Sequence, residues 1–378
     1  MPNENEIIEE LKRGKIALPP LTLRLLQVQP EIGENRRADA IIEVSWQDNT
    51  AKFAVEMKSI WTPKAFQGAL SLLRSSSLPQ SYQPMLIMPF LNEQQLLELE
   101  RQKISGVDLC GNGVVIVPGV FAVYRSGGKN RYTSSAPIKN IYRKNSSMVG
   151  RVFLVRPGYD TVQEICAEIN QRNMLVQRWD KIPMSLSTVS KSLKALEDDL
   201  IVERKDVIRL LQADKLLENL RENYVPPKIK ARVRLKVPDS RGTIQELLQT
   251  KSGELSLPLV ATGTSSVSQY TVMQRGEILS VYCPRLEQLL ERLSGNQSDR
   301  FPNLELIETE DETAFFDARQ KDAFWWSSPI QVYLELMAGD KRDRETAENL
   351  SSYILNNLQS YVHDHDAHSP HCATRPSP

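Results

Sequence analysis

Three side chains near the amino terminus could together hold a divalent cation and act on a phosphate ester. Asp39 precedes the strand-like run AIIEV, residues 40–44, and Glu56 and Lys58 close the run 53–58. Side chains two residues apart in an extended strand share a face, so Glu56 and Lys58 point the same way. A hairpin between the two runs would bring Asp39 beside Glu56. We therefore expect two carboxylates and one ammonium at one edge of a sheet.

Two carboxylates are ligands that suit Mg²⁺, which completes its octahedron with water and phosphate oxygens. Held by Asp39 and Glu56, the ion would polarise a phosphodiester and lower the pKa of a bound water. Lys58 would orient that water or offset developing charge. Other acid-x-lysine triplets occur at residues 10–12 and 203–205. A solvated cross-strand ion pair, worth less than about 1 kcal/mol, is the alternative interpretation.

Histidine occurs only at the end of the chain, which excludes several classes of active site. A Ser-His-Asp hydrolase, a Cys-His protease and a histidine-based metal centre each need an imidazole in the folded body. Residues 1–362 contain none. Residues 363–378 show no apolar periodicity, and we expect a disordered tail there. The four histidines lie in that tail: His363, His365, His368 and His371.

The formal net charge is zero, because 47 Lys and Arg residues balance 47 Asp and Glu residues. Any affinity for nucleic acid must therefore come from local patches. The 4 cysteines are scattered without the CxxC spacing of a zinc site. The amino terminus has no leader pattern, and no apolar run reaches the roughly 18 residues that span a bilayer. We expect a cytoplasmic protein with no membrane segment.

A chain of 378 residues is too long for one core, and we predict an α/β multidomain protein. Residues 1–145 alternate helical and strand patterns, which indicates an α/β sandwich. Residues 150–212 hold short amphipathic helices and then a hairpin, an order typical of a winged helix-turn-helix. Paired prolines at 226–227 mark a boundary, and residues 213–362 predict a mixed α+β domain. Within it, the TGTSS stretch at 262–266 is expected to form a strand and a turn.

One long segment contains no acid. Residues 109–159 hold eight cations and no Asp or Glu, with two tyrosines between the cations. Such a segment favours phosphate contacts that weaken with salt. The alternative is a solvated linker whose cations balance the charge of acids elsewhere in the chain. The cations are Arg125, Lys129, Arg131, Lys139, Arg143, Lys144, Arg151 and Arg156, and the tyrosines are Tyr132 and Tyr142.

The sequence SLSTVSKSLKALE, residues 185–197, predicts an amphipathic helix. Its apolar stripe is Leu186, Val189, Leu193 and Leu196. Its outward side chains are Ser187, Thr188, Ser190, Lys191 and Lys194. The second helix of a helix-turn-helix presents such residues to base edges and phosphates. We expect Arg204 and Lys205 at the tip of the next hairpin, near a groove or the DNA backbone. N-capping is the alternative role for Ser185 and Ser187.

A second basic element is predicted over residues 228–237. Cations alternate there with apolar residues, so a half-buried strand would expose only positive charge. This face could bind a polyanion, or it could protect a sheet edge from aggregation.

The order helix, Asp39 strand, Glu56-x-Lys58 strand, helix and strand resembles the PD-(D/E)XK restriction-endonuclease-like superfamily. ISGVDLCGNGVVI, residues 104–116, is similar to the strand and glycine turn that close such domains. The sequences SLSTVSKSLKALE, ATGTSSVSQYTV and SPIQVYLELMAGDKRDRETAENL add to the likeness. Over residues 1–360 the chain resembles the AbiEi-like antitoxin and transcriptional-regulator family of type IV toxin-antitoxin, or abortive-infection, systems.

The resemblance assigns Asp39, Glu56 and Lys58 to the nuclease triad, with Mg²⁺ as the cofactor if the site is active. It implies a regulator of bacterial phage defence that binds double-stranded DNA sequence-specifically. A nucleotidyltransferase-like toxin and a second copy of the chain are the implied protein partners. The alternative from a different class is a Mg²⁺-dependent DNA endonuclease targeted by its winged helix. Many regulators of this type keep the nuclease fold without demonstrated cleavage.

Overall fold

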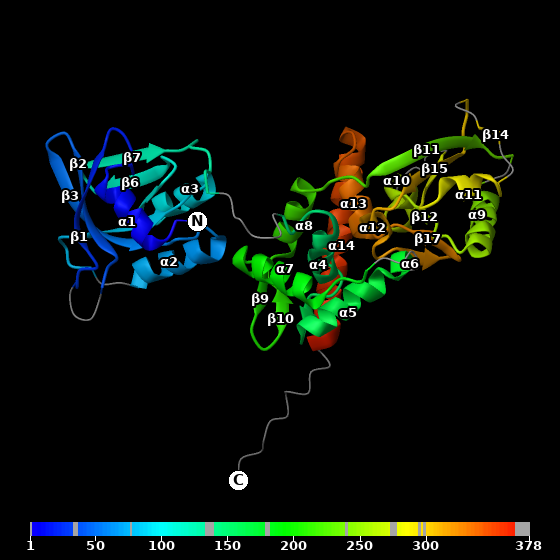
Figure 1. Ribbon diagram of the computed structural model, residues 1–378, viewed down its shortest axis with the longest axis horizontal. Coiled ribbons are helices and arrows are strands. Elements are labelled where there is room, and N and C mark those ends of the chain that lie inside the picture. Colours follow the sequence, from blue (N-terminus) through cyan, green and yellow to red (C-terminus); the bar gives the residue numbers. More distant parts are fainter. Residues whose placement is uncertain are drawn as a thin grey trace, which may run out of the picture. The chain divides into compact units, whose positions relative to one another are not determined.

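The computed structural model shows a mixed α/β protein whose chain divides into two compact units, residues 1–139 and 140–378 (Figure 1). Each unit is described by itself. The described residues are 2–32, 37–75, 78–132, 140–177, 182–238, 241–272, 278–293, 296–297 and 300–366. Residues 367–378 of the expected tail lie outside them, whereas residues 363–366 end the last helix, Lys341–Asp366, so the prediction of disorder was wrong for those four residues. No helix among the described residues is long and apolar enough to cross a bilayer.

The first unit is built on a seven-stranded sheet in which the strands lie in sequence order. β3 pairs in parallel with β4, and β4 with β5, whereas the other neighbours are antiparallel. The sequence patterns had not indicated β1, whereas the short β5 lies in the stretch 104–116 that resembles a strand and a glycine turn. The strands are β1 Thr22–Val28, β2 Ala40–Trp46, β3 Asn49–Met57, β4 Gln83–Met88, β5 Ser105–Asp108, β6 Gly113–Val117 and β7 Phe121–Arg125.

Helices cover both faces of this sheet. α1 (Glu4–Lys12) packs Ile7 and Leu11 on the face that includes Val55 and Met57 of β3. α2 (Pro63–Ser75) and α3 (Glu93–Arg101) pack on the opposite face. Strand alternation therefore directs Glu56, between Val55 and Met57, toward the α2 and α3 side. The candidate triad therefore lies where β2 begins and β3 ends.

The second unit begins with helices and a small sheet. β8, β10 and β9 form a three-stranded antiparallel sheet in that order. Val189, Leu193 and Leu196 of α7 are buried in its core, but Leu186 is 47% exposed and does not belong to the apolar stripe. The elements are α4 Ser147–Phe153, β8 Gly158–Tyr159, α5 Val162–Arg172, α6 Met174–Gln177, α7 Leu186–Asp198, β9 Val202–Arg204, β10 Ile208–Leu210 and α8 Ala213–Glu222.

The rest of the second unit holds a mixed sheet of seven strands in the order β14-β11-β15-β13-β12-β17-β16. Its strands are β11 Ile229–Lys236, β12 Val260–Ala261, β13 Leu279–Cys283, β14 Asn296–Gln297, β15 Leu304–Thr309, β16 Arg319–Lys321 and β17 Phe324–Trp326. Its helices are α9 Arg241–Leu255, α10 Gly263–Ser266, α11 Leu286–Leu290, α12 Glu312–Phe315, α13 Pro329–Met337 and α14 Lys341–Asp366. The TGTSS stretch therefore starts a helix, α10, and the prediction of a strand and a turn there was wrong.

Candidate functional site

The ends of β2 and β3 bring the three predicted triad residues together. Ala40 pairs with Val55, so Asp39 lies opposite Glu56 in the antiparallel register. The Asp39 amide donates to Val55 O at 3.0 Å, and Asp39 Oδ2 accepts the Met57 amide at 2.6 Å. Lys58 Nζ donates to Glu56 Oε1 at 2.7 Å. Backbone pairing thus fixes Asp39 beside the Glu56–Lys58 pair.

The electrostatics of this site favour binding of a cation or a proton at Asp39. Burial raises the pKa of the Asp39 carboxyl, the Met57 amide opposes that shift, and the charges of Glu56 and Glu4 raise the pKa further. The ammonium of Lys58 has a smaller opposing effect. Glu4, near the start of α1, was not predicted as part of this site. Its charge acts on Asp39 from another element, an effect that strand periodicity does not reveal.

The donor set of the triad fits Mg²⁺ with a mostly aqueous shell. Asp39 and Glu56 supply carboxylate oxygens, and one oxygen of Glu56 is already paired with Lys58. Among the described residues, no three His, Cys, Asp or Glu side chains group closely enough to hold a metal ion together. Mg²⁺ commonly binds through one or two carboxylates and keeps several waters. Asp39 and Glu56 would hold the ion, which would supply Lewis acidity at a phosphate.

The ISGVDLCGNGVVI stretch contains a buried acid with a structural role. Asp108, at the end of β5, accepts the Leu91 amide at 3.0 Å and the Cys110 and Asn112 amides at 2.8 Å each. The Asn112 side chain donates to Asp108 at 2.7 Å and exchanges hydrogen bonds with the Gly128 backbone. Asp108 is 1% exposed. Because its oxygens are already satisfied, it organises the loop and is not part of the triad.

The acid-free segment does not form one uniform basic surface. Lys129, Arg143 and Lys144 are exposed, whereas the Arg131 guanidinium donates to Leu109 O. Lys129 and Arg131 belong to the first unit, and Arg143 and Lys144 belong to the second. Lys139 lies outside the described residues.

Arg151 and Tyr142 of that segment are buried, which corrects the expectation of phosphate contacts for them, and Arg156 forms an ion pair within the second unit. Arg151 is 3% exposed and donates to Gln331 Oε1 at 2.8 Å. Arg156 is paired with Glu164 at 2.5 Å. Tyr142 is buried, and its hydroxyl donates to Asp199 at 2.7 Å. These side chains stabilise the second unit because each has a specific internal partner.

Helix α7 presents the polar face that the sequence predicted. Ser185 is the N-cap, and its Oγ accepts the Thr188 amide at 3.2 Å. Thr188 is half-buried, whereas the other outward residues are exposed: Ser187, Ser190, Lys191 and Lys194. The N-cap role therefore belongs to Ser185, and the exposed hydroxyl of Ser187 stays available for contacts.

The β9–β10 hairpin adds a second basic element beside α7. Arg204 is exposed at the end of β9. Glu203 pairs with Lys205 and with Arg209, both at 2.7 Å. Arg209 was not among the predicted contacts. The hairpin register places it across from Glu203, so it adds a third cation to the turn region.

Acids in β15 or directly after it pair with three cations of β11. Glu305 of β15 pairs with Arg232 at 3.4 Å and with Arg234 at 3.0 Å. Lys230 pairs with Glu310 at 2.8 Å. β14 pairs only with Leu235 and Lys236 of β11, so on that side residues 229–234 lie beyond the β14 ladder, as the edge-protection interpretation requires. Cross-strand ion pairing explains the alternation better than a free polyanion surface does.

The TGTSS stretch meets Glu335, a half-buried acid of α13. The Gly263 amide donates to Glu335 Oε2 at 2.6 Å, and Tyr282 and Gln331 donate to Glu335 Oε1 at 3.1 and 2.8 Å. Gln331 in turn accepts from Arg151. Burial raises the pKa of Glu335, while these donors and the Arg151 charge oppose the shift. This network joins α4, α10 and α13 inside the second unit.

Comparison of the chain with models of protein families, with curated proteins and with solved structures found no match.

Proposed function

We propose that the protein is a sequence-specific DNA-binding regulator of a bacterial toxin-antitoxin defence system. The observation that supports this most is the element order α4, β8, α5, α6, α7, β9, β10, with β8, β10 and β9 in one sheet. Apart from the short α6, this order resembles that of a winged helix-turn-helix, and we assign α7 as the recognition helix and the β9–β10 hairpin as the wing.

In this proposal α7 and the wing contact different parts of the DNA. Ser187, Ser190 and Thr188 reach base edges from the first turns of α7, and Lys191 and Lys194 contact phosphates. Arg204, Lys205 and Arg209 of the wing contact a groove or the backbone. The first unit is a restriction-endonuclease-like domain that adds phosphate contacts through Lys129 and Arg131.

Salt-dependent DNA binding tests the proposal. A preferred sequence is first selected from random duplexes with the full chain, and fluorescence anisotropy then gives the Kd at several salt concentrations. We expect Lys191→Ala with Lys194→Ala to weaken binding about tenfold or more and to reduce the slope of log K against log salt by about 2. Ser187→Ala with Ser190→Ala should instead relax sequence preference.

Lys215→Ala is the matched control, because Lys215 lies in the same unit on α8 and pairs with Glu218. It should bind DNA like the wild type. Binding by the Lys191 and Lys194 double variant that equals the wild type at every salt concentration would overturn the proposal.

The second candidate function is Mg²⁺-dependent DNA cleavage, favoured by the assembled Asp39, Glu56 and Lys58. In that reaction Lys58 would orient a water or stabilise charge on the phosphate, and the carboxylates would hold the ion. Plasmid DNA is incubated with Mg²⁺ and the wild type, Glu56→Ala or Lys58→Ala. The regulator proposal expects intact plasmid in all three. Cleavage by the wild type that both variants lose would make the endonuclease the leading function.

The protein partners follow from the family resemblance alone. We propose a nucleotidyltransferase-like toxin, and a second copy of the chain, as partners of the second unit. A gene for such a toxin next to this one, and its co-purification with this chain, would support the first. Light scattering of the purified chain tests the second.

A further inference from the structure

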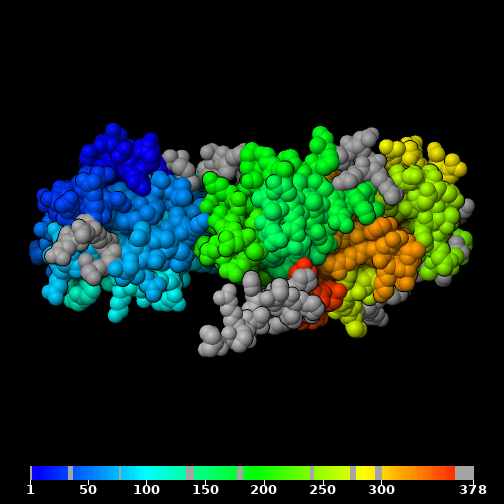
Figure 2. Space-filling model, turned by 90° about the horizontal axis from the view of Figure 1, so that it is seen from below, coloured from blue at the N-terminus to red at the C-terminus, as the bar shows by residue number. Residues whose placement is uncertain are grey.

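The first residue of helix α7 is an apolar side chain that the core does not take up. Leu186 is 47% exposed, although Val189, three residues later, is fully buried. In Figures 1 and 2 the green segment that includes α7 lies at the surface of the second unit. Single exposed apolar residues are common on proteins, so the surroundings of Leu186 decide what it can bind.

The surroundings of Leu186 are polar and positively charged. Residues four apart in a helix lie on one ridge, so Leu186, Ser190 and Lys194 are aligned along α7. Ser187 and Lys191 lie beside this ridge, and these four polar residues are all exposed. Within the described part of the chain, neither lysine pairs with an acid. A row that combines hydroxyls and uncompensated cations is complementary to DNA, and Leu186 stands at its amino-terminal end.

The direction of Leu186 is fixed before any partner binds. Ser185 caps α7, and its Oγ accepts the Thr188 amide at 3.2 Å. Met184 exchanges two hydrogen bonds with Asn170 of α5: its amide donates to Asn170 Oδ1 at 2.8 Å, and its carbonyl accepts Asn170 Nδ2 at 3.2 Å. The chain that enters α7 is therefore tied to α5, which lowers the entropic cost of a contact made by the first turn.

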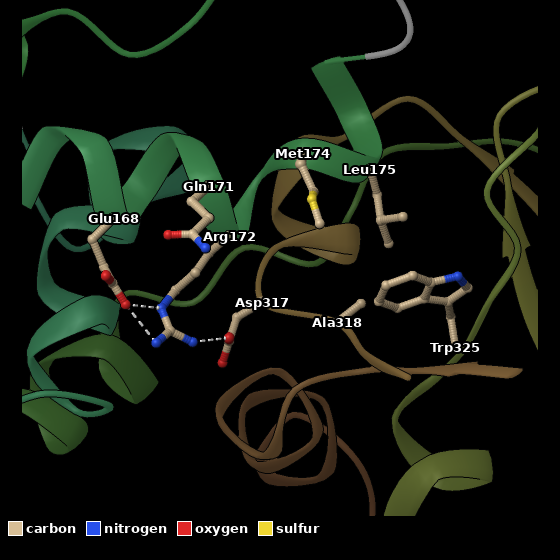
Figure 3. Close-up of a pocket in the computed structure, with 8 residues that line it drawn as sticks. All are labelled: Glu168, Gln171, Arg172, Met174, Leu175, Asp317, Ala318 and Trp325. Atoms are coloured by element: carbon tan, nitrogen blue, oxygen red, sulfur yellow. Dashed lines mark hydrogen bonds and ion pairs between the residues drawn. The ribbon is translucent and has the colours of Figure 1, made fainter. Parts of the chain in front are cut away.

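Helix α5 is itself anchored to the rest of the second unit (Figure 3). Arg172 Nε donates to Glu168 Oε1 at 2.8 Å, and its Nη1 donates to Asp317 Oδ1. The Asp317 amide donates back to Arg172 O at 3.1 Å. Figure 3 shows the guanidinium between the two carboxylates. Because α5 is held in this way and α5 holds the start of α7, Leu186 is presented on a rigid support.

The major groove of DNA offers one apolar group to such a side chain. Base pairs present hydrogen-bond donors and acceptors there, and only thymine adds a methyl group, at C5. The amino-terminal residues of a recognition helix contact base edges, whereas cations contact the phosphates. The order along α7 agrees with this geometry, because Leu186 and Ser187 come first and Lys191 and Lys194 follow.

We infer that Leu186 packs on the C5 methyl group of a thymine in the major groove and so selects an A·T pair at one position of the bound site. The inference rests on the proposed function and adds the chemistry of one base position to it. Deoxyuridine is the probe, since it pairs as thymidine does and lacks only that methyl group.

Single replacements of thymidine by deoxyuridine in the selected duplex test the inference with the full-length chain. Fluorescence anisotropy gives the Kd for each substituted duplex. We expect a position at which deoxyuridine weakens wild-type binding about fourfold, the effect of losing one buried methyl group. Leu186→Ala should bind the thymine duplex at least about fourfold more weakly than the wild type, and it should not distinguish deoxyuridine from thymidine at that position.

Leu211→Ala is the matched control. Leu211 has the same side chain, is 48% exposed and lies between β10 and α8 of the same unit. This variant should bind the selected duplex like the wild type and keep the preference for thymidine over deoxyuridine. Circular dichroism and light scattering verify that each variant is folded and has the oligomeric state of the wild type.

Three results would each overturn the inference while DNA binding itself stands: a selected sequence without thymine, no position at which deoxyuridine weakens wild-type binding, or a Leu186→Ala variant that keeps the full preference for thymidine. A Leu186→Ala variant with a lower molecular mass than the wild type would assign the side chain to a contact between copies of the chain, which also overturns it. A wild-type chain that shows neither salt dependence nor sequence preference would instead contradict the proposed function, and the inference with it.

Discussion

Asp39 is the triad residue whose protonation depends most clearly on the fold. Its carboxyl is partly buried opposite Glu56, and burial is the largest cause of its raised pKa. Because the folded pKa exceeds the unfolded value, the folded state binds a proton more tightly in the interval between them. Stability therefore decreases as pH rises through that interval. At higher pH the folded state bears the full free-energy cost of a charged, partly buried Asp39 carboxylate.

Asp39→Asn should remove this cost while keeping an acceptor for the Met57 amide. We expect the variant to gain stability relative to the wild type at pH 7 to 8, and the gain to disappear as pH falls toward the ordinary value of 3.8. Hydrogen exchange of the β2 and β3 amides at several pH values measures the difference. Asp39→Ala, which loses the acceptor, is the control and should be less stable than Asp39→Asn at each pH. A pH-independent gain would contradict the assigned cause.

For single residues, the sequence correctly predicted the proximity of side chains that strand periodicity and one hairpin bring together. Asp39, Glu56 and Lys58 met as expected for that reason. Arg151 was misassigned because its partner Gln331 is 180 residues away, and no local pattern distinguishes a buried arginine from an exposed one. Asp317 was not singled out, since its role depends on contacts with α5 that only the tertiary structure creates.

Among the elements, amphipathic helices were predicted better than short or mixed-burial strands. The stripe of α7 followed from its 3.6-residue period, apart from exposed Leu186. β15 carries Glu305 and Glu308 among its apolar residues, yet Leu304 and Leu306 are fully buried and Glu305 pairs with cations of β11. Five of its six residues are buried. A strand buried on both faces lacks the apolar–polar alternation by which strands are recognised.

The junction of α10 with α13 allows a prediction about close packing. A Cβ at Gly263 would lie 2.4 Å from Glu335 Oε2, in the place of the present hydrogen bond. Gly263→Ala should therefore destabilise the second unit by about 1–3 kcal/mol, because hydrogen bonds from Tyr282 and Gln331 hold the Glu335 carboxylate in place. Urea unfolding measures the loss.

Gly253→Ala is the matched control for that substitution. A Cβ at Gly253 meets nothing within 4 Å, and the residue lies inside helix α9. Alanine favours a helix over glycine by roughly 0.5–1 kcal/mol, so this variant should be as stable as the wild type or more so. Equal effects of the two substitutions would show that Glu335 does not constrain Gly263.

For the whole molecule, the two units have separate cores. Each of the described hydrophobic clusters lies entirely within residues 1–139 or within 140–378. In the second unit, by contrast, Arg151 and Arg172 connect the helical part to the large sheet and its helices. Composition and length predicted several domains. The sequence does not show which neighbouring segments contact one another, because those contacts depend on such buried partners.

Separate cores predict that the two units fold independently. Residues 1–139 and 140–378, expressed as separate chains, should each unfold cooperatively at the midpoint that the same unit shows in the full chain. If α7 and the wing read the DNA sequence, the fragment 140–378 should keep the sequence preference of the full chain. It should also show a weaker salt dependence, since Lys129 and Arg131 are absent and each lost phosphate contact reduces the slope by about 0.9. Calorimetry and anisotropy measure these quantities. An unfolded fragment 140–378 would contradict the independence of the units. A folded fragment without sequence preference would instead indicate that the first unit recognises the DNA sequence.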